Sequence, residues 1–258
     1  MALVEYSLNN KCVYIKINRP EKKNALNYDT VMELKKAFTK AETESKAKII
    51  VLTGEGDYFC AGADLEYLSK LQKYSYDENL NDSIHLMQLF KLVYHLKKPV
   101  LSMIKGGALA GGCGLVAVSD FAFATEDSKF GFTEVRIGFL PAIVSVFLIR
   151  KMGEAKTKEL LISGEIFDSK KALELGLITS VFPADELEKQ TEAFIDKLLQ
   201  HNSSNSMNAT KQLINKITCL SFEDALKYAA EANAKNRLSE DCKKGIAAFL
   251  EKKDLIWN

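Results

Sequence analysis

The sequence lacks a surplus of charge of either sign and contains few histidines and prolines. Its 258 residues include 35 Lys and Arg against 34 Asp and Glu, which gives a net charge of +1. Proteins that bind nucleic acid over a broad surface carry a clear excess of basic residues, so we expect no nucleic-acid partner. No apolar run is long enough to span a membrane, because the longest, residues 137–149, is interrupted by Gly138 and Pro141.

Cysteine is also scarce, and it is scattered. The five cysteines are Cys12, Cys60, Cys113, Cys219 and Cys242. Their number is odd and no two form a CxxC pair, which argues against a disulfide framework and against a metal site. The start of the chain, MALVEYSLNNK, lacks the basic and apolar regions of a secretion signal. We therefore expect a cytoplasmic protein without a bound metal.

The first half of the chain alternates strands with helices. Strands are predicted at residues 13–17, 48–53, 100–104 and 121–124, and helical periodicity at 28–41 and 64–96, with a break near Tyr74. This order implies crossover connections and a largely parallel sheet. Nearly everything after residue 142 is predicted to be helical. The sequence thus predicts an α/β core over residues 1–200 and a helical region over 201–258, with a polar hinge at 203–206.

Two glycine-containing segments each follow a predicted strand and open a helix: DYFCAGAD at 57–64 and KGGALAGGCG at 105–114. Small residues let a ligand approach the backbone, and a helix start leaves N–H groups unpaired and partly positive. One such turn alone is more often a packing feature. Two of them could aim one N–H each at a single oxygen and stabilise an oxyanion. The second segment is not a phosphate loop, since no Gly-Lys-Ser/Thr follows it.

The strings FCAGADLEYL and KGGALAGGCGLVAVSDFAFATEDSKFGFTEVRIGFLP resemble the crotonase (enoyl-CoA hydratase/isomerase) superfamily. The resemblance extends over nearly the whole chain, from INRPEKKNALN to FLEKK. It implies an α/β fold made of a spiral of ββα repeats with a C-terminal helical trimerisation region. The implied partners are an acyl-CoA thioester and further copies of the chain, as a homotrimer or a dimer of trimers. Coenzyme A is part of the substrate, so no separate cofactor is implied.

The same resemblance implies roles for individual residues. The oxyanion hole would consist of the N–H groups of Ala63 and Gly111. The residues implied to contact coenzyme A are Lys22, Lys23, Ala25, Ala61, Gly62, Asp64, Leu65, Gly112 and, on the last helix, Lys252. Cys60 and Cys113 flank the loops, but no histidine is near them in sequence to activate a thiol, so we expect packing roles for both.

Hydratases of this family typically carry two glutamates, and here only one remains. The first position is Gly114 and the second is Glu134. The apolar neighbours Phe132 and Val135 suggest a raised pKa for Glu134, which suits proton transfer near neutral pH. One carboxylate can move a proton between C2 and C4 of an enoyl thioester, which is isomerisation. It can also activate water for addition at C3, which is hydration, and the residues do not choose between the two.

The sequence GGCGLVAVSD, together with FGFTEVRIGFLPA, resembles the branch of the superfamily that contains 3-methylglutaconyl-CoA hydratases of leucine breakdown. This favours a lyase that hydrates a short or branched 2-enoyl-CoA. A substrate carboxylate would need a cation, for which Lys70 and Arg136 are the candidates, and Tyr67 and Tyr76 could line the acyl pocket. The alternatives are an isomerase that uses Glu134, a non-catalytic homologue, and an enzyme that acts on acyl-carrier-protein substrates.

Overall fold

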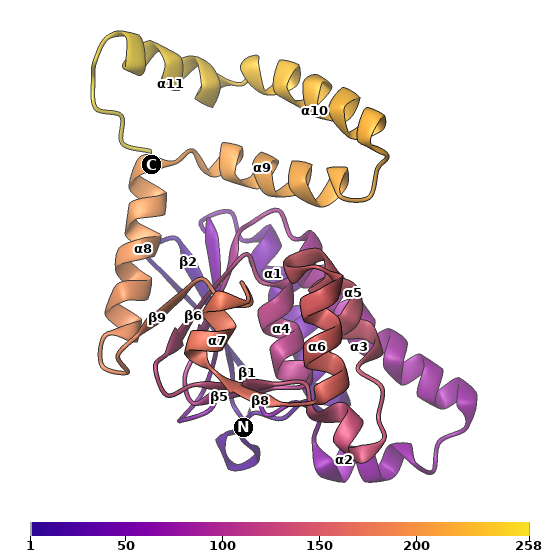
Figure 1. Cartoon of the computed structure of the whole chain (residues 1–258). Coiled ribbons are helices and arrows are strands. Elements are labelled where there is room, and N and C mark those ends of the chain that lie inside the picture. Colours follow the sequence, from indigo (N-terminus) through magenta and orange to yellow (C-terminus); the bar gives the residue numbers. More distant parts are fainter. Residues whose placement is uncertain (1, 258) are drawn as a thin grey trace.

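A six-stranded sheet forms the centre of the computed structural model, which describes residues 2–257 (Figure 1). Its strands lie in the order β1 (Val4–Asn9), β2 (Cys12–Ile17), β3 (Ile49–Gly54), β4 (Val100–Ile104), β6 (Phe121–Thr125) and β9 (Ser180–Phe182). Every neighbouring pair is parallel except the β1–β2 hairpin. The predicted parallel arrangement is therefore confirmed.

Three short strands form a second sheet beside the first. β5 (Gly107–Leu109) pairs in parallel with β7 (Lys129–Gly131), and β7 pairs antiparallel with β8 (Ile166–Asp168). The expectation of helix after residue 142 missed β8 and β9. A strand of three residues is too short to show an alternating pattern, and its extended form is stabilised by the strand it pairs with.

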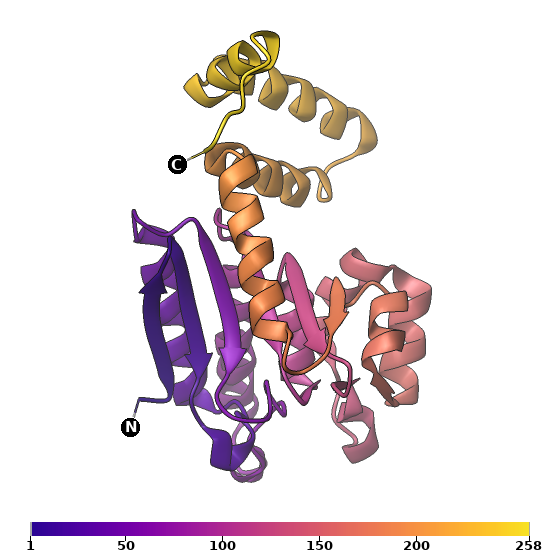
Figure 2. The same cartoon turned by 90° about the vertical axis from the view of Figure 1, so that its left-hand side faces the viewer.

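Apolar side chains cover both faces of the large sheet, which explains why β3 begins with four consecutive apolar residues. On one face, Ile50 and Leu52 of β3 pack with α1 (Tyr28–Thr43), α3 (Tyr76–His95) and α4 (Gly111–Val118). On the other face, Ile49 and Val51 pack with Leu187 and Ile195 of α8 (Leu187–His201). Figure 2 shows α8 lying along this second face.

The expected break in the long helical stretch is confirmed. α2 (Leu65–Leu71) ends before Ser75, which begins α3 with a capping box: the Ser75 hydroxyl accepts from the Glu78 N–H, and the Glu78 carboxylate accepts from the Ser75 N–H. Beyond α4 the core contains α5 (Ala142–Met152), α6 (Glu154–Ser163) and α7 (Ser169–Glu174). Among residues 2–257, no helix combines the length and apolarity needed to cross a membrane.

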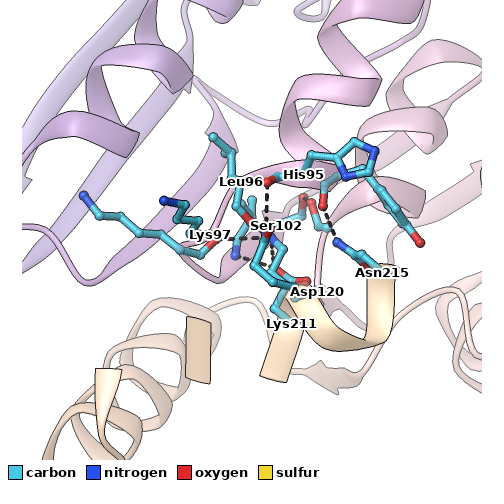
Figure 3. Close-up of polar contacts among 12 residues, drawn as sticks. His95, Leu96, Lys97, Ser102, Asp120, Lys211 and Asn215 are labelled. Carbon is cyan, nitrogen blue, oxygen red and sulfur yellow. Dashed lines mark hydrogen bonds and ion pairs between the residues drawn. The ribbon is translucent and has the colours of Figure 1, made fainter. Parts of the chain in front are cut away.

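The helices α9 (Ser204–Ile217), α10 (Phe222–Arg237) and α11 (Glu240–Leu250) lie beyond one end of the core (Figures 1 and 2). α9 attaches to the core through polar side chains (Figure 3). Lys211 pairs with Asp120 at 2.6 Å, and the amides of Gln212 and Asn215 donate to the carbonyls of His95 (3.1 Å) and Tyr94 (2.7 Å). These contacts satisfy carbonyl groups at the end of α3. The proposed boundary between residues 200 and 201 falls in the last turn of α8.

Candidate active site

The two glycine-containing loops lie side by side. Cys60 and Ala108 form a parallel bridge, in which the Cys60 N–H donates to the Gly107 carbonyl at 3.2 Å and the Leu109 N–H donates to the Cys60 carbonyl at 3.0 Å. Further along, a Cβ added at Gly62 would lie 2.9 Å from the Ala110 Cβ and 3.5 Å from the Gly111 nitrogen. The segments 57–64 and 105–114, which are far apart in sequence, therefore meet as the oxyanion hypothesis requires.

The orientation of the Ala63 N–H follows from the hydrogen bonds of its neighbours. Leu26 donates to the Gly62 carbonyl at 2.7 Å and accepts from the Asp64 N–H at 2.8 Å. In parallel pairing, the residue between two such bonds directs its own N–H to the opposite side. The Ala63 N–H thus faces away from Leu26, and among residues 2–257 it donates to no protein acceptor. Ala63 is exposed, so a ligand oxygen can reach this group.

The Gly111 N–H is the first of α4 and is likewise unpaired within the described residues. Ala110 precedes it with φ 47° and ψ −117°, a conformation that residues with a side chain rarely adopt. Such backbone strain costs about 1–3 kcal/mol and persists only where surrounding contacts impose it. Here the Ala110 N–H donates to the Gly131 carbonyl at 2.8 Å, and its carbonyl accepts from the Gly114 N–H at 3.0 Å. This turn sets the direction of the Gly111 N–H.

Glu134 is brought to the same place by the small sheet. β5 and β7 run parallel in register, so both end at one edge; β5 continues into Ala110 and Gly111, and β7 continues into Glu134. Glu134 is half-buried, and its Oε2 is buried without a hydrogen-bond partner among the described residues. Burial raises the pKa of this carboxyl above its ordinary value. A carboxyl with no hydrogen-bond partner and a raised pKa is a candidate for both accepting and returning a proton.

The cysteines of the two loops are both buried. Burial is the main reason that the pKa of the Cys113 thiol is raised, and the negative charge of Glu134 contributes to the same shift. Cys113 itself is fully buried and donates to the Ala108 carbonyl at 2.9 Å, and burial raises the pKa of Cys60 to about 12. Both thiols are in packing positions, as expected.

The space that the side chain of the first glutamate would need, at Gly114, is occupied by another side chain. A Cβ added at Gly114 would lie 2.5 Å from Cζ of Phe90, whose ring is 1% exposed on α3. A side chain at residue 114 would have to displace this ring from the core. No local pattern in the sequence points to Phe90, because its contact with Gly114 joins two separate helices. Of the two expected glutamate positions, only residue 134 therefore carries a carboxylate.

Most of the residues implied to bind coenzyme A surround the Ala63 loop. The Ala61 N–H donates to the Lys23 carbonyl at 3.0 Å, which places Lys22, Lys23 and Ala25 alongside residues 61–65. Leu65 is 79% exposed. Lys22 pairs with Glu66 at 2.5 Å, and Lys23 lies over the Tyr58 ring.

For two of the implied residues, Lys252 and Asp64, one chain shows no free side chain at the loops, and their contacts with coenzyme A stay predictions. Figures 1 and 2 place the end of α11 far from α2 and β5, so one chain does not bring Lys252 to the loops. The Asp64 carboxylate is buried and already bonded: it accepts from the N–H groups of Glu66 (2.9 Å) and Tyr67 (3.3 Å) and pairs with Arg19 at 2.7 Å. Burial alone would raise the pKa of Asp64, but Arg19 and these N–H groups outweigh it and hold the pKa below its ordinary value.

A cavity of about 670 Å³ lies elsewhere, between strands β1–β4 and α8. Its charged side chains include Glu5, Lys16, Glu188 and Glu192, and Lys16 already pairs with Glu5 and Glu55. None of the candidate residues lines it. Because the unpaired N–H groups and the unpaired carboxyl oxygen are at the loops, we assign the site to the loops. No cluster of three His, Cys, Asp or Glu able to hold a metal occurs in residues 2–257.

Comparison with known proteins shows which family the chain belongs to. A family described as enoyl-CoA hydratase/isomerase matches residues 7–258. A Thermus thermophilus protein, provisionally named an enoyl-CoA hydratase, is 36% identical and covers 92% of this chain and 93% of its own. The crotonyl-CoA hydratase of Syntrophomonas wolfei is 31% identical, with 94% and 93% covered. The crystal structure of an enoyl-CoA hydratase from Shewanella pealeana superposes with a TM-score of 0.92 at 30% identity, covering 99% of this chain and 96% of that one.

Proposed function

Because the chain belongs to the enoyl-CoA hydratase/isomerase family, we propose that it adds water across the double bond of a short or branched 2-enoyl-CoA. One observation carries the proposal: Oε2 of Glu134 is buried without a hydrogen-bond partner among the described residues, and the strand that leads to Glu134 pairs with the strand that leads to Gly111. The names of its relatives, which include a crotonyl-CoA hydratase and a short-chain-enoyl-CoA hydratase, support hydration over other reactions of enoyl thioesters.

In this mechanism the thioester oxygen accepts hydrogen bonds from the N–H groups of Ala63 and Gly111. Glu134 removes a proton from water as its oxygen bonds to C3, and the electron pair of the double bond moves onto the thioester oxygen as an enolate. Glu134 then returns the proton to C2, which completes the 3-hydroxyacyl thioester. Each N–H donor stabilises the enolate, and loss of one costs about 3 kcal/mol, or roughly a hundredfold in rate. No cofactor besides the coenzyme A of the substrate takes part.

One observation favours a second candidate, the isomerisation of a 3-enoyl-CoA to a 2-enoyl-CoA. The Phe90 ring occupies the space beside Gly114, so the site offers one proton carrier rather than two. Isomerisation needs only one, because Glu134 could take the proton from C4 and return it to C2 through the same enolate.

A substrate with a second carboxylate, such as 3-methylglutaconyl-CoA, would need a cation at the site. Arg136 is exposed, is two residues from Glu134 and pairs with no acid in the described part of the chain. Lys70, at the end of α2, is also exposed and free of such a pair. We propose that one of these side chains binds the distal carboxylate, and Arg136→Gln and Lys70→Gln distinguish them by a raised KM for that substrate alone.

We also propose that the chain assembles as a homotrimer or a dimer of trimers. α10 and α11 bury no residue within one chain, while Phe222, Phe249 and Leu250 are 75%, 83% and 74% exposed. Exposed apolar side chains gathered on neighbouring elements mark an interface. Native mass spectrometry of the parent and of Phe249→Ser tests this: we expect a trimer or hexamer that the substitution weakens. A monomeric parent would contradict it.

The free state of the cysteines supports a cytoplasmic location. All five are unbonded thiols, and Cys12, Cys60 and Cys113 are buried. Disulfides are rare in the reducing cytosol, so free thiols fit that compartment. We include this location in the proposal.

The reaction is tested with a panel of 2-enoyl-CoA and 3-enoyl-CoA substrates, assayed with the parent and Glu134→Gln. We expect the parent to hydrate at least one 2-enoyl-CoA and the variant to lose about 10²–10⁴-fold in kcat, since general base catalysis is removed. Glu174→Gln, on exposed α7, is the matched control and should behave as the parent. Undiminished hydration by Glu134→Gln would refute the assignment of the base. Turnover of 3-enoyl-CoA alone would establish the isomerase.

A further inference from the structure

An ion pair is buried directly beside the Ala63 loop. Arg19 and Asp64 are 8% and 5% exposed, and Nη2 of Arg19 lies 2.7 Å from Oδ2 of Asp64. In the part of the chain that the structure describes, every other ion pair has at least one partner whose side chain is a quarter or more exposed. Removing two charges from water costs several kcal/mol per ion, and apolar residues of similar size are often as stable. Stability alone is therefore a poor reason for placing this pair here.

The guanidinium of Arg19 connects the Ala63 loop with the neighbouring segment that contains Ala25 and Leu26. Its Nη2 binds Asp64, the residue after Ala63, and its Nη1 donates to the carbonyl of Ala25, the residue before Leu26. Leu26 and Ala63 are themselves the centre of a parallel bridge. Arg19 thus binds both segments of this bridge, each one residue away from the bridging pair. These contacts add to the two backbone hydrogen bonds that Leu26 makes with Gly62 and Asp64.

The turn that carries Arg19 is held by hydrogen bonds of Asn24. Its N–H donates to Oδ1 of Asn24 at 2.9 Å, and Nδ2 of Asn24 donates to the carbonyls of Glu55 (2.9 Å) and Tyr58 (2.5 Å). Asn24 is fully buried and has a positive φ of 56°. The backbone of Arg19 is therefore anchored through Asn24 to the loop after β3, and the guanidinium extends from this fixed point to Ala25 and Asp64. A planar fork anchored in this way can fix direction as well as distance.

We propose that Arg19 is a positioning residue for the reaction: through Asp64 and Ala25 it fixes the direction of the Ala63 N–H toward the thioester oxygen. The inference rests on the proposed use of that N–H in the oxyanion hole. Catalytic groups must be held to within fractions of an ångström, and a misplacement of about 1 Å can cost a hundredfold in rate. Lysine cannot replace arginine here, since one ammonium cannot bond both acceptors in the geometry of the fork.

The test uses the carbonyl stretch of a bound thioester, because that frequency reports how strongly the N–H donors polarise the C=O bond. The probe is a saturated short-chain acyl-CoA labelled with ¹³C at the thioester carbonyl, measured by infrared difference spectroscopy. In the parent we expect a lowered frequency. In Arg19→Met we expect the shift to shrink and kcat to fall by about 10–100-fold with KM nearly unchanged, since one donor of two is misdirected. Arg19→Lys should resemble Arg19→Met.

Asp64→Asn covers the case in which the Arg19 variants do not fold. Asparagine is as good an N-cap as aspartate, so α2 keeps its first turn while the ion pair is lost. This variant should also reduce the carbonyl shift. The matched control is Lys211→Met, which removes the other largely buried ion pair, with Asp120, at the far end of the sheet (Figure 3). It should leave both the carbonyl shift and kcat at parental values.

The outcomes separate this inference from the proposed function. A parental carbonyl shift in Arg19→Met, or in Asp64→Asn where the former is unfolded, overturns the positioning role and leaves the oxyanion hole standing. Absence of any shift in the parent overturns both. If Lys211→Met reduces the carbonyl shift as much as Arg19→Met does, loss of any buried ion pair has this effect. That result also overturns the specific role of Arg19.

Discussion

The two ends of the six-stranded sheet use buried polar groups in opposite ways. At the carboxyl end, after β2 and β3, the Arg19–Asp64 pair and the Leu26 bridge hold a loop so that the Ala63 N–H stays unpaired. At the amino end, before β4 and β6, Asp120 accepts from the Val100 N–H at 2.7 Å and pairs with Lys211. The first arrangement leaves a backbone donor free for a ligand, and the second pairs the backbone groups that it contacts.

At the amino end, three lysines donate hydrogen bonds to backbone carbonyl groups. Lys98 donates to the carbonyls of Ala41 and Glu44 at the end of α1, and Lys151 donates to those of Val116 and Ser119 at the end of α4. Lys211 does the same for the Lys98 carbonyl. Burial lowers the pKa of Lys151 to about 8. Cations at helix C-termini satisfy carbonyls and the helix dipole together, so this end of the molecule is an anchor for helices.

The largest effect is expected from Gly112→Ala at the carboxyl end. A Cβ there would lie 2.2 Å from the Cys60 carbonyl, so the two loops would have to separate. We expect kcat/KM to fall by more than about a hundredfold, as both N–H donors lose their common target. Gly176→Ala is the control: nothing lies within 4 Å of the added methyl, although a φ of 77° strains alanine there. Parental turnover in Gly112→Ala would show that the loops need not touch.

Ionisation of the Glu134 carboxyl should increase activity and decrease the stability of the fold. A base must be deprotonated, so kcat/KM should rise with pH through the raised pKa of Glu134, and this limb should vanish in Glu134→Gln. A raised folded-state pKa favours the folded protein at low pH, and that stability is lost as pH rises through it. Glu134→Gln should therefore melt above the parent at neutral pH, with the difference fading near pH 4.5, the ordinary glutamate pKa. Thermal melts at several pH values check this, and equal melting temperatures throughout would contradict it.

At the amino end, Lys211→Met should reduce stability and not chemistry. Asp120 is left without its cation but is about a quarter exposed, so we expect a loss of about 1–2 kcal/mol in the free energy of unfolding. Amide hydrogen exchange should accelerate in α9 and at the end of α3, where Gln212 and Asn215 bond. A large fall in kcat with unchanged exchange would show that the two ends are coupled more directly than their contacts suggest.

The smallest effect is expected from Ala110→Gly. Glycine adopts φ of 47° without strain but gains freedom in the unfolded chain, and the two effects partly cancel. We expect the free energy of unfolding to rise by no more than about 1 kcal/mol, with kcat close to parental. Chemical denaturation measures the first and steady-state assays the second. A loss of more than about 1 kcal/mol would mean that Ala110 contributes packing that outweighs its strain.

The sequence predicts the carboxyl end of the sheet better than the contacts that organise it. β3 and β4 are apolar runs closed by glycine-containing turns, so the loops with Ala63 and Gly111 follow from local patterns. Glu134 was assigned through resemblance alone, because the strands β5 and β7 that deliver it are three residues long. The contacts of Arg19 with Asp64, and of Phe90 with Gly114, join residues far apart in the chain and leave no local signal.

The most direct test of the account is a crystal structure of the protein with a saturated short-chain acyl-CoA bound. The account predicts a thioester oxygen about 2.7–3.1 Å from both the Ala63 and Gly111 nitrogens, with the Glu134 carboxyl facing C2 and C3. A thioester oxygen bonded to only one of these N–H groups, or bound away from both, would contradict it.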